Sequence, residues 1–501
     1  MEERYLALAD LGTSKIALTV ARITGNNTEV MYYRETPSEG IRYGSIFNPM
    51  KASESLRKSV ENAENELGIK IKQLVTNMPR GSVRQESSPA QIERSDPYTC
   101  ISAEEVDALK NITLDSYPLE DSQHEEIYGA VAQSFSTDDM IHASEADIVG
   151  VCSERLDGNF RIFIGAKKPV DNIFRTTNLL NLAIAKKVFT PDAVGRAVLN
   201  EGELENGVGL VEIGCGVTSV SIFESNILRY YASIPFGGGI ITSDIKMECN
   251  VKGALAENIK LAFGACQPEK LQTMSEKILI LNNEELCSNQ KLPVKYLSEI
   301  ITCRMREIMQ AIFFLIQSSG YADRLRSGLV VTGGGANLLN CINFIKEESG
   351  YSVRVGFPHT NAFSNSDCEG FGSPSSTTSV AMLLATKDDP YLNCLESAPV
   401  RTTPETEAEQ AENEELKEDE EEVQETEESV EISEKPGKKE DTGDIFAPVP
   451  DEKEEKTKEK VKEKAKETKP SFLVKWGSSL RDAIGEIWDS SIIGKSYEDM
   501  E

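Results

Sequence analysis

The chain has 501 residues, a formal net charge of −30, 39% apolar residues and 27% charged residues. This length leaves room for two or three domains, and the strong acidity argues against nucleic-acid binding through bulk charge. The ten cysteines form no Cys-x-x-Cys pair, so we expect free thiols in a reducing compartment and no zinc.

The first part of the chain alternates strand and helix patterns. Residues 5–23 predict two strands around a glycine turn, with no signal peptide before them. A helix is expected at 50–67, ending at Gly68, and a strand at 72–77. No apolar run reaches eighteen residues, so no membrane-spanning helix is expected.

Residues 82–165 read as a compact α+β insertion. Ser102 and Glu105 have the spacing of a capping box and predict the start of a helix. Strands are expected at 127–135, 148–153 and 160–165.

The pattern then returns to a larger domain. We expect a helix at 171–186, a hairpin from 219–223 and 227–233, helices at 240–249 and 254–263, and a long apolar helix at 296–317.

Three glycine-bearing turns, each after an apolar strand-like run, recur in order. They span 8–15, 210–218 and 329–337. A strand that ends in a tight glycine turn points backbone N–H groups beyond it, and phosphate is the usual occupant. One such turn alone would read as an ordinary tight turn. The ordered set predicts two facing half-domains that hold one nucleotide, with the third turn as a platform for its base.

The composition changes after residue 386. Residues 387–469 lack apolar periodicity and predict a disordered linker, with sixteen acidic residues and one lysine in 405–434 and seven lysines in 456–469. A terminal helix is expected at 470–490, followed by a tail at 491–501. Its apolar residues recur every three or four positions: Phe472, Leu473, Trp476, Leu480, Ile484, Ile487 and Trp488.

Such a helix can dock in a protein groove or lie in a membrane interface. We favour the membrane, because apolar insertion is assisted by the preceding lysines near anionic lipid.

Taken together, these segments resemble the actin/Hsp70/sugar-kinase ATPase superfamily and, within it, the FtsA family of bacterial cell-division proteins. Residues 10–15 resemble the first phosphate loop of the family, and 234–245 resemble the stretch after its second loop. Residues 256–260 resemble its ribose-contacting helix, and 331–337 its adenine loop. The insertion lies where FtsA proteins carry their own small subdomain.

The resemblance implies an α/β, actin-like ATPase fold with two facing half-domains. Residues 1–81 and 166–205 would form the first half-domain, interrupted by the insertion at 82–165. Residues 206–328 would form the second, and 329–386 the adenine loop and the return to the first.

The resemblance also implies a nucleotide site. Its residues would be Asp10, Gly12, Thr13, Ser14, Lys15, Gly214, Gly216, Thr218, Gly238, Glu257, Lys260, Gly333, Gly334, Gly335, Ala336 and Asn337. Asp10 and Glu212 would hold Mg²⁺ through water. Structural alternatives stay open: Asp10 as a turn former, Lys15 as a solvated lysine, and Glu257 with Lys260 as a surface ion pair.

Several positions depart from the family pattern. Glu212 stands in place of Asp, Cys215 in place of Gly, Ser219 in place of another Asp, and Thr190 in place of a Glu before Pro191. We therefore expect ATP binding with feeble hydrolysis. No catalytic residue is assigned, and Glu212 is the only candidate.

The implied function is that of an actin-like division protein that binds ATP and polymerises. It would tether the FtsZ ring to the inner face of the cytoplasmic membrane at the division site. The FtsZ C-terminal tail would dock near 240–325, and the insertion would contact other divisome proteins or neighbouring subunits. ATP would act as a conformational ligand.

Three other classes of protein fit the sequence less well. A sugar-kinase-like phosphotransferase would need a general base and a sugar pocket, and neither is identifiable. An Hsp70-like chaperone would need a β-rich domain after residue 386. A pilus-assembly actin homologue shares the core, but the terminal tryptophan-bearing helix counts against it.

Overall fold

The computed structural model describes residues 3–94, 96–283, 288–364 and 368–396, which belong to one compact unit. The remainder of the predicted linker, the predicted helix at 470–490 and the tail at 491–501 lie outside the described residues. Within those residues, no helix is both long and apolar enough to cross a bilayer.

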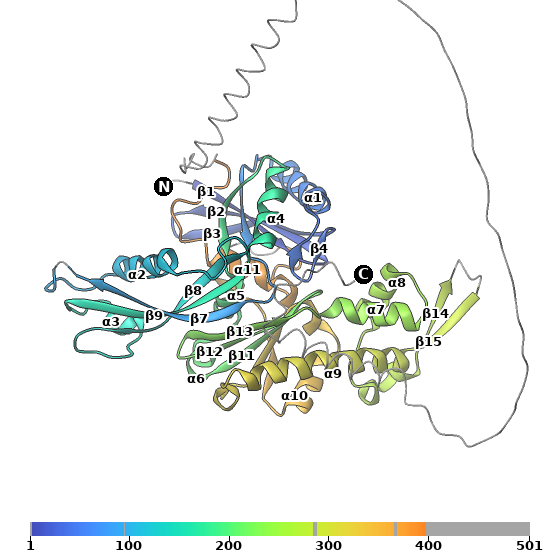
Figure 1. Ribbon diagram of the computed structural model, residues 1–501. Helices are drawn as coiled ribbons and strands as arrows, with labels where there is room; N and C mark the ends of the chain where they lie inside the picture. The colour runs from blue at the N-terminus through green and yellow to red at the C-terminus, as the bar shows by residue number, and fades with distance from the viewer. Residues whose placement is uncertain (1–2, 95, 284–287, 365–367, 397–501) are drawn as a thin grey trace, which may run out of the picture. The chain divides into compact units, whose positions relative to one another are not determined.

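A five-stranded sheet organises the N-terminal part, in the order β10-β6-β1-β2-β3. Strands β1, β2 and β3 are labelled side by side in Figure 1. Strands β1, β2 and β3 are antiparallel neighbours, whereas β1, β6 and β10 run parallel. The strands are β1 (Glu3–Leu11), β2 (Lys15–Thr24), β3 (Asn27–Pro37), β6 (Gln73–Asn77) and β10 (Ala183–Val188). The predicted strand pair at 5–23 and the strand at 72–77 are confirmed.

A second five-stranded sheet repeats the same topology, in the order β13-β12-β11-β16-β17. Again three antiparallel neighbours are extended by two parallel strands. The strands are β11 (Val208–Ile213), β12 (Thr218–Glu224), β13 (Ile227–Ile234), β16 (Leu329–Thr332) and β17 (Val353–Val355). Because β1 and β11 hold equivalent places, the glycine turn after each lies at the equivalent edge of its sheet.

Helix α1 (Pro49–Leu67) shows why the sequence signals were readable. The Asn48 side chain accepts a hydrogen bond from the Lys51 N–H at the N-terminus, and Pro49 fits the first turn, whose N–H needs no partner. Gly68 ends the helix in the left-handed region, at φ 67°. Ala52, Leu56 and Val60 are buried on the face that packs against the first sheet.

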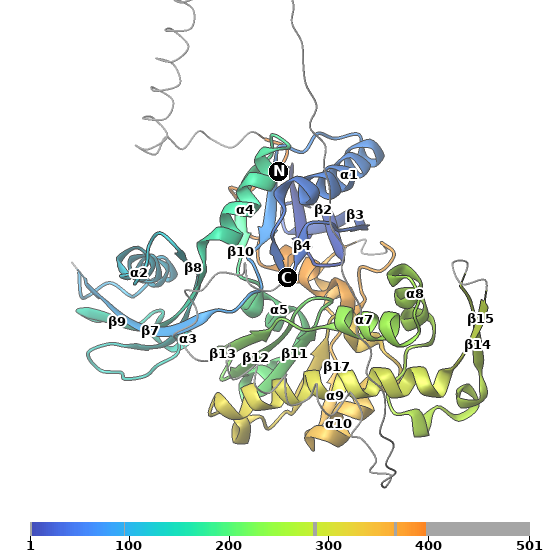
Figure 2. The same cartoon turned by 45° about the vertical axis from the view of Figure 1, so that its right-hand side comes forward.

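Most of the other helices of the two halves pack on the sheets, whereas α7 and α8 pack on each other and α7 packs on α9. Helix α9 is the longest of the described helices and contacts β12 and β13. It runs below the second sheet in Figure 2, and its buried apolar residues include Ile301, Ile308 and Ile312. The helices are α4 (Lys167–Asn178), α5 (Thr190–Val198), α6 (Glu201–Asn206), α7 (Gly238–Glu248), α8 (Gly253–Phe263), α9 (Val294–Ser318), α10 (Cys341–Ser349) and α11 (Thr377–Leu384). Two hairpins complete the halves: β4 (Ile41–Arg42) with β5 (Ser45–Ile46), and β14 (Ile278–Asn283) with β15 (Ser288–Pro293).

The insertion is a three-stranded sheet in the order β7-β9-β8, with α2 packed on it (Figure 1). Ser102 and Glu105 form the predicted capping box, and Leu109, Phe135 and Phe160 meet in a separate small core. The elements are β7 (Arg84–Glu93), α2 (Ala103–Ser116), β8 (Glu125–Ser136), α3 (Glu145–Ile148) and β9 (Arg155–Ala166).

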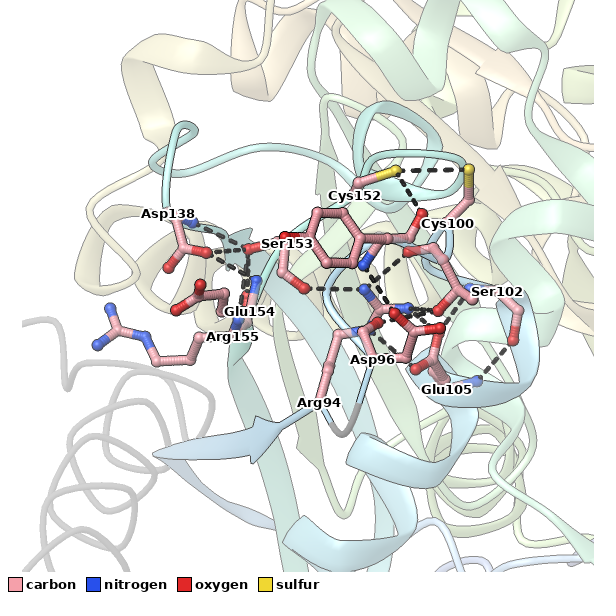
Figure 3. A network of polar contacts seen from close by, with 12 residues as sticks. Arg94, Asp96, Cys100, Ser102, Glu105, Asp138, Cys152, Ser153, Glu154 and Arg155 are labelled. Atoms are coloured by element: carbon pink, nitrogen blue, oxygen red, sulfur yellow. Dashed lines mark hydrogen bonds and ion pairs between the residues drawn. The ribbon is translucent and has the colours of Figure 1, made fainter.

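Arg94 holds together two connections of the insertion, the one from β7 to α2 and the one from α3 to β9 (Figure 3). Its guanidinium pairs with Glu105 at 2.9 Å and donates to the Ser153 carbonyl at 2.8 Å. Beside it, the Cys100 and Cys152 sulfurs lie 3.7 Å apart, and both residues are exposed.

The insertion also contacts the second half-domain through side chains. The Gln85 amide donates to the Tyr231 carbonyl at 2.6 Å and accepts from the Tyr231 N–H at 3.1 Å. Gln133 donates to the Leu228 carbonyl at 3.0 Å, and Arg161 donates to the Arg229 carbonyl at 2.6 Å. All three acceptors are on β13, the edge strand of the second sheet.

Three sequence-based boundaries were wrong. The strand expected at 148–153 is the end of α3 followed by irregular chain, and the helix expected at 171–186 ends at Asn178. The alternating part after Asn181 instead continues the first sheet as β10. The folded part also extends past residue 386, because Cys394 is buried and its carbonyl accepts hydrogen bonds from Lys72 and Gln73 at 2.9 and 3.0 Å.

Candidate nucleotide site

The first and second glycine turns face each other across the two halves. A Cβ on Gly216 would lie 2.6 Å from Thr13 Oγ1, so only glycine fits at this approach. Thr13 is itself fixed, because its Oγ1 accepts from the Gly44 N–H at 3.0 Å. Sequence and structure therefore agree that these distant turns lie together.

The backbone of both turns leaves donors available. The Gly12 N–H donates to the Lys15 carbonyl at 3.1 Å, and the Gly214 N–H to the Val217 carbonyl at 2.9 Å. Within the described residues, the N–H groups of Thr13, Ser14, Cys215 and Gly216 donate to no protein acceptor. Clustered free N–H groups of this kind form an anion-binding concavity.

The start of α7 packs directly on the second turn. The Gly238 N–H donates to the Gly214 carbonyl and the Gly239 N–H to the Cys215 carbonyl, both at 2.8 Å. A Cβ on Gly237 would lie 2.4 Å from the Gly214 oxygen, so the chain needs glycine there. The predicted binding residue Gly238 therefore supports the turn through its backbone.

The third turn joins the second because β11 and β16 pair in parallel, with Glu212 opposite Thr332. Gly333 has φ +86°, and its Cβ would lie 2.5 Å from the Ile213 oxygen. The remaining predicted residues form a short 3₁₀ turn, η4 (Gly334–Asn337). Thr218, predicted from the second turn, is buried at the start of β12, and its Oγ1 has no partner within the described residues.

Glu257 and Lys260 join α8 to α7. The buried Lys260 ammonium lies 2.8 Å from Glu257, 3.0 Å from the Gly238 carbonyl and 2.8 Å from the Thr242 hydroxyl. Lys15 instead pairs with Glu35 on β3. A phosphate contact by Lys15 would thus require this ion pair to open.

The two predicted metal carboxylates share an arginine that the sequence reading missed. Arg80 Nη1 lies 2.6 Å from Glu212 Oε1, and Nη2 lies 3.5 Å from Asp10 Oδ1. The same guanidinium donates to the Thr378 hydroxyl, which lies 3.2 Å from Glu212. Arg80 therefore bridges the end of β1, the end of β11 and the start of α11.

Burial governs the electrostatics of this cluster. Burial raises the pKa of Asp10, Arg80 opposes the rise and Glu212 adds to it. For Arg80, burial disfavours the charged form, but Glu212 and Asp10 outweigh it and raise the pKa. Arg80 therefore stays cationic.

The residues around these carboxylates fit the family's Mg²⁺ poorly. Glu212 is paired with the Arg80 guanidinium, whereas Asp10 Oδ1 lies 3.5 Å from it and has no hydrogen-bond partner within the described residues. No group of three or more metal-ligating side chains occurs in that part of the chain. The arrangement fits a fixed organic cation better than a hydrated metal ion. The metal assignment from sequence stays a prediction.

A positional signal could have identified Arg80. The fully buried strand β6 runs parallel to β1, with Thr76 opposite Ala9. Because the carboxyl ends of parallel strands meet at one edge, the first charged residue after β6 lies near Asp10.

Two sheets of the same topology, with facing glycine turns at equivalent edges, define an actin-like ATPase fold. Comparisons with known proteins refine this class. Residues 209–381 match the family model described as "Cell division protein FtsA".

The cell division protein FtsA of Borreliella burgdorferi is 30% identical over 364 residues, covering 72% of this chain and 86% of the relative. The Neisseria meningitidis FtsA is 26% identical, covering 71% and 84%. The chain therefore belongs to the FtsA family of cell division proteins.

Solved structures give weaker overall similarity. The "PilM-PilN type IV pilus biogenesis complex" has a TM-score of 0.49 at 13% identity, covering 76% of this chain and 98% of the other. The structure of MreB5 of Spiroplasma citri bound to ADP has a TM-score of 0.44 at 13% identity, covering 76% and 95%.

Proposed function

We propose that this FtsA-family chain binds ATP between its two halves. The observation that carries the proposal is the close approach of Thr13 and Gly216, with unpaired backbone N–H groups in both turns. Phosphate groups would accept hydrogen bonds from these donors, and the third glycine turn would support the base.

We further propose that the chain polymerises and tethers FtsZ to the inner face of the cytoplasmic membrane at the division site. The insertion would contact neighbouring subunits or other divisome proteins. The FtsZ C-terminal tail would dock on the second half-domain near 240–325. This region exposes apolar side chains on three helices, Met247 on α7, Leu261 on α8 and Tyr296 on α9, which supports a docking role.

ATP would serve as a conformational ligand with feeble hydrolysis. Thr190 stands at the first position of α5, where the family pattern has a glutamate, and Glu212 is committed to Arg80. Without a carboxylate to orient water, phosphate release should stay well below about 1 s⁻¹, the low end of ordinary enzyme turnover.

Calorimetric titration of the full chain with ATP tests the proposal. Gly216→Ala should weaken ATP binding by roughly tenfold or more, because the new methyl group enters the Thr13 side chain. Gly253→Ala is the matched control, since a Cβ there meets nothing within 4 Å.

No ATP uptake by the wild-type chain, with or without magnesium, would overturn the proposal. Equal loss of affinity in both glycine variants would show that the contacts between the turns are irrelevant to binding.

A further inference from the structure

Arg80 occupies the place between the two carboxylates where the family resemblance puts a metal ion. Its guanidinium lies 2.6 Å from Glu212 on one half and 3.5 Å from Asp10 on the other. Only 18% of the Arg80 side chain is exposed, and the two carboxylate side chains are 12% and 13% exposed. These three groups form the "Arg80 bridge".

The Arg80 bridge is held from several sides. The Arg80 backbone N–H donates to the Gly44 carbonyl at 3.2 Å, and the guanidinium Nη2 donates to the Thr378 hydroxyl. Gly44 has φ +69°, and a Cβ on it would lie 2.9 Å from the Arg80 Cβ. The chain therefore fixes the guanidinium in place before any ligand arrives.

The charges of the Arg80 bridge determine which ions can bind between the two carboxylates. Two buried carboxylates facing each other need a cation, and Arg80 supplies one permanent charge. A magnesium ion would have to displace the guanidinium or lie beside a like charge. Mg²⁺ also requires near-octahedral oxygen ligands at about 2.1 Å, or ordered water in their place.

A guanidinium can replace part of what a metal does for a nucleotide. Its planar donors bind phosphate oxygens as well as carboxylates, and the charge neutralises the phosphate chain. Unlike a metal ion, it is never lost to a chelator.

We propose that Arg80 takes the place of the metal ion, so that this chain binds ATP without requiring Mg²⁺. The inference rests on the proposed ATP site and adds the identity of its cation. A nucleotide would then close the halves around a cation that belongs to the chain itself.

Titration of the full chain with ATP in excess EDTA and in magnesium buffer tests this inference. The two dissociation constants should agree within about threefold. Binding in magnesium that weakens more than about tenfold in EDTA would overturn the inference and leave the ATP site standing. No binding in either buffer would overturn both.

Substitution supplies an independent test. Arg80→Met keeps the length without the charge, and we expect ATP binding to become dependent on magnesium by about tenfold or more. Arg80→Lys should retain binding in EDTA. Arg84→Met is the control, because Arg84 pairs with Glu86, Glu120 and Glu125 in and around the insertion.

The wild-type chain supplies a further test if Arg80→Met does not fold. Titration with Mn²⁺ in saturating ATP, which supplies the phosphate ligands, should detect by electron paramagnetic resonance no ion held by the carboxylates of the chain. Stoichiometric Mn²⁺ binding that is removed by Asp10→Asn would overturn the inference.

Discussion

At the residue scale, two adjacent glycines of the third turn have opposite surroundings. A Cβ on Gly335 would lie 2.3 Å from Ile213 Cγ2, and Ile213 is fully buried. A Cβ on Gly334 would meet nothing within 4 Å. The two glycines therefore differ in how well they should tolerate a side chain, although the sequence does not distinguish them.

We expect Gly335→Ala to lower the free energy of unfolding by about 1–3 kcal/mol, because Ile213 cannot move without disturbing β11. Gly334→Ala should change it by less than about 0.5 kcal/mol, since the methyl group enters open space. Urea unfolding of both variants, followed by circular dichroism, measures the difference. Equal destabilisation would contradict the packing described for this turn.

The residues of the site were only partly predictable. Glycines could be found because a strand followed by a tight turn leaves a local pattern. Arg80 could not be assigned from a local pattern, because its partners Glu212 and Thr378 are distant in sequence and meet it only after both sheets form. The ion pair of Lys15 with Glu35 was missed because it depends on the register between β2 and β3.

At the element scale, local signals determined which boundaries were predictable. The end of α1 at Gly68 and the start of α2 at its capping residue Ser102 were both predicted. The helix expected at 171–186 failed because its apolar residues continue beyond Asn178, where Asn181 at φ 55° breaks the helix. Strand β7 was missed because it is polar and half-exposed, and its pairing with β9 is non-local.

The Cys100 and Cys152 thiols, which lie on the two connections beside Arg94, are close enough for us to expect a disulfide between them. Oxidised glutathione should join Cys100 to Cys152, whose sulfurs are 3.7 Å apart (Figure 3). Both thiols lose their protons, and two electrons reduce glutathione disulfide to two glutathione thiols. The disulfide would close the loop between Cys100 and Cys152. Because it reduces the chain entropy of the unfolded state, it should raise the free energy of unfolding by about 4 kcal/mol.

Peptide mass mapping after alkylation measures this reaction. A Cys100–Cys152 peptide should appear in the wild-type chain and be absent from Cys100→Ser. The exposed Cys303 on α9 serves as an internal reference for general thiol oxidation. Free, alkylated Cys100 and Cys152 after full oxidation of the reference would contradict the prediction.

At the scale of the whole molecule, the repeated sheet topology explains why distant glycine turns converge. Each half places its first strand centrally, between two antiparallel strands and two parallel ones. The order of the turns in the sequence predicted two facing half-domains, and the family resemblance implied the fold class. The contacts between the insertion and β13 did not, because they join side chains to a backbone edge.

The predicted helix at 470–490 lies outside the described residues, and its membrane role can be tested on the full chain. We expect sedimentation with anionic lipid vesicles, lost in a chain that ends at Lys469 and in Trp488→Asp. Each large apolar side chain contributes about 1.5–3 kcal/mol on burial, whereas a charge opposes insertion.

Trp488→Phe is the matched control and should still sediment, since it keeps an aromatic apolar side chain. Equal sedimentation of the truncated chain would exclude this helix as the tether.

Strand β13 would present unpaired backbone groups at the edge of its sheet if the insertion were absent. The side chains of Gln85, Gln133 and Arg161 donate hydrogen bonds to β13 carbonyl groups that a further strand would otherwise pair with. A strand from another molecule could therefore pair with β13 only after the insertion had moved off this edge. If nucleotide binding moves the second half as proposed, we expect these hydrogen bonds to transmit the movement to the insertion.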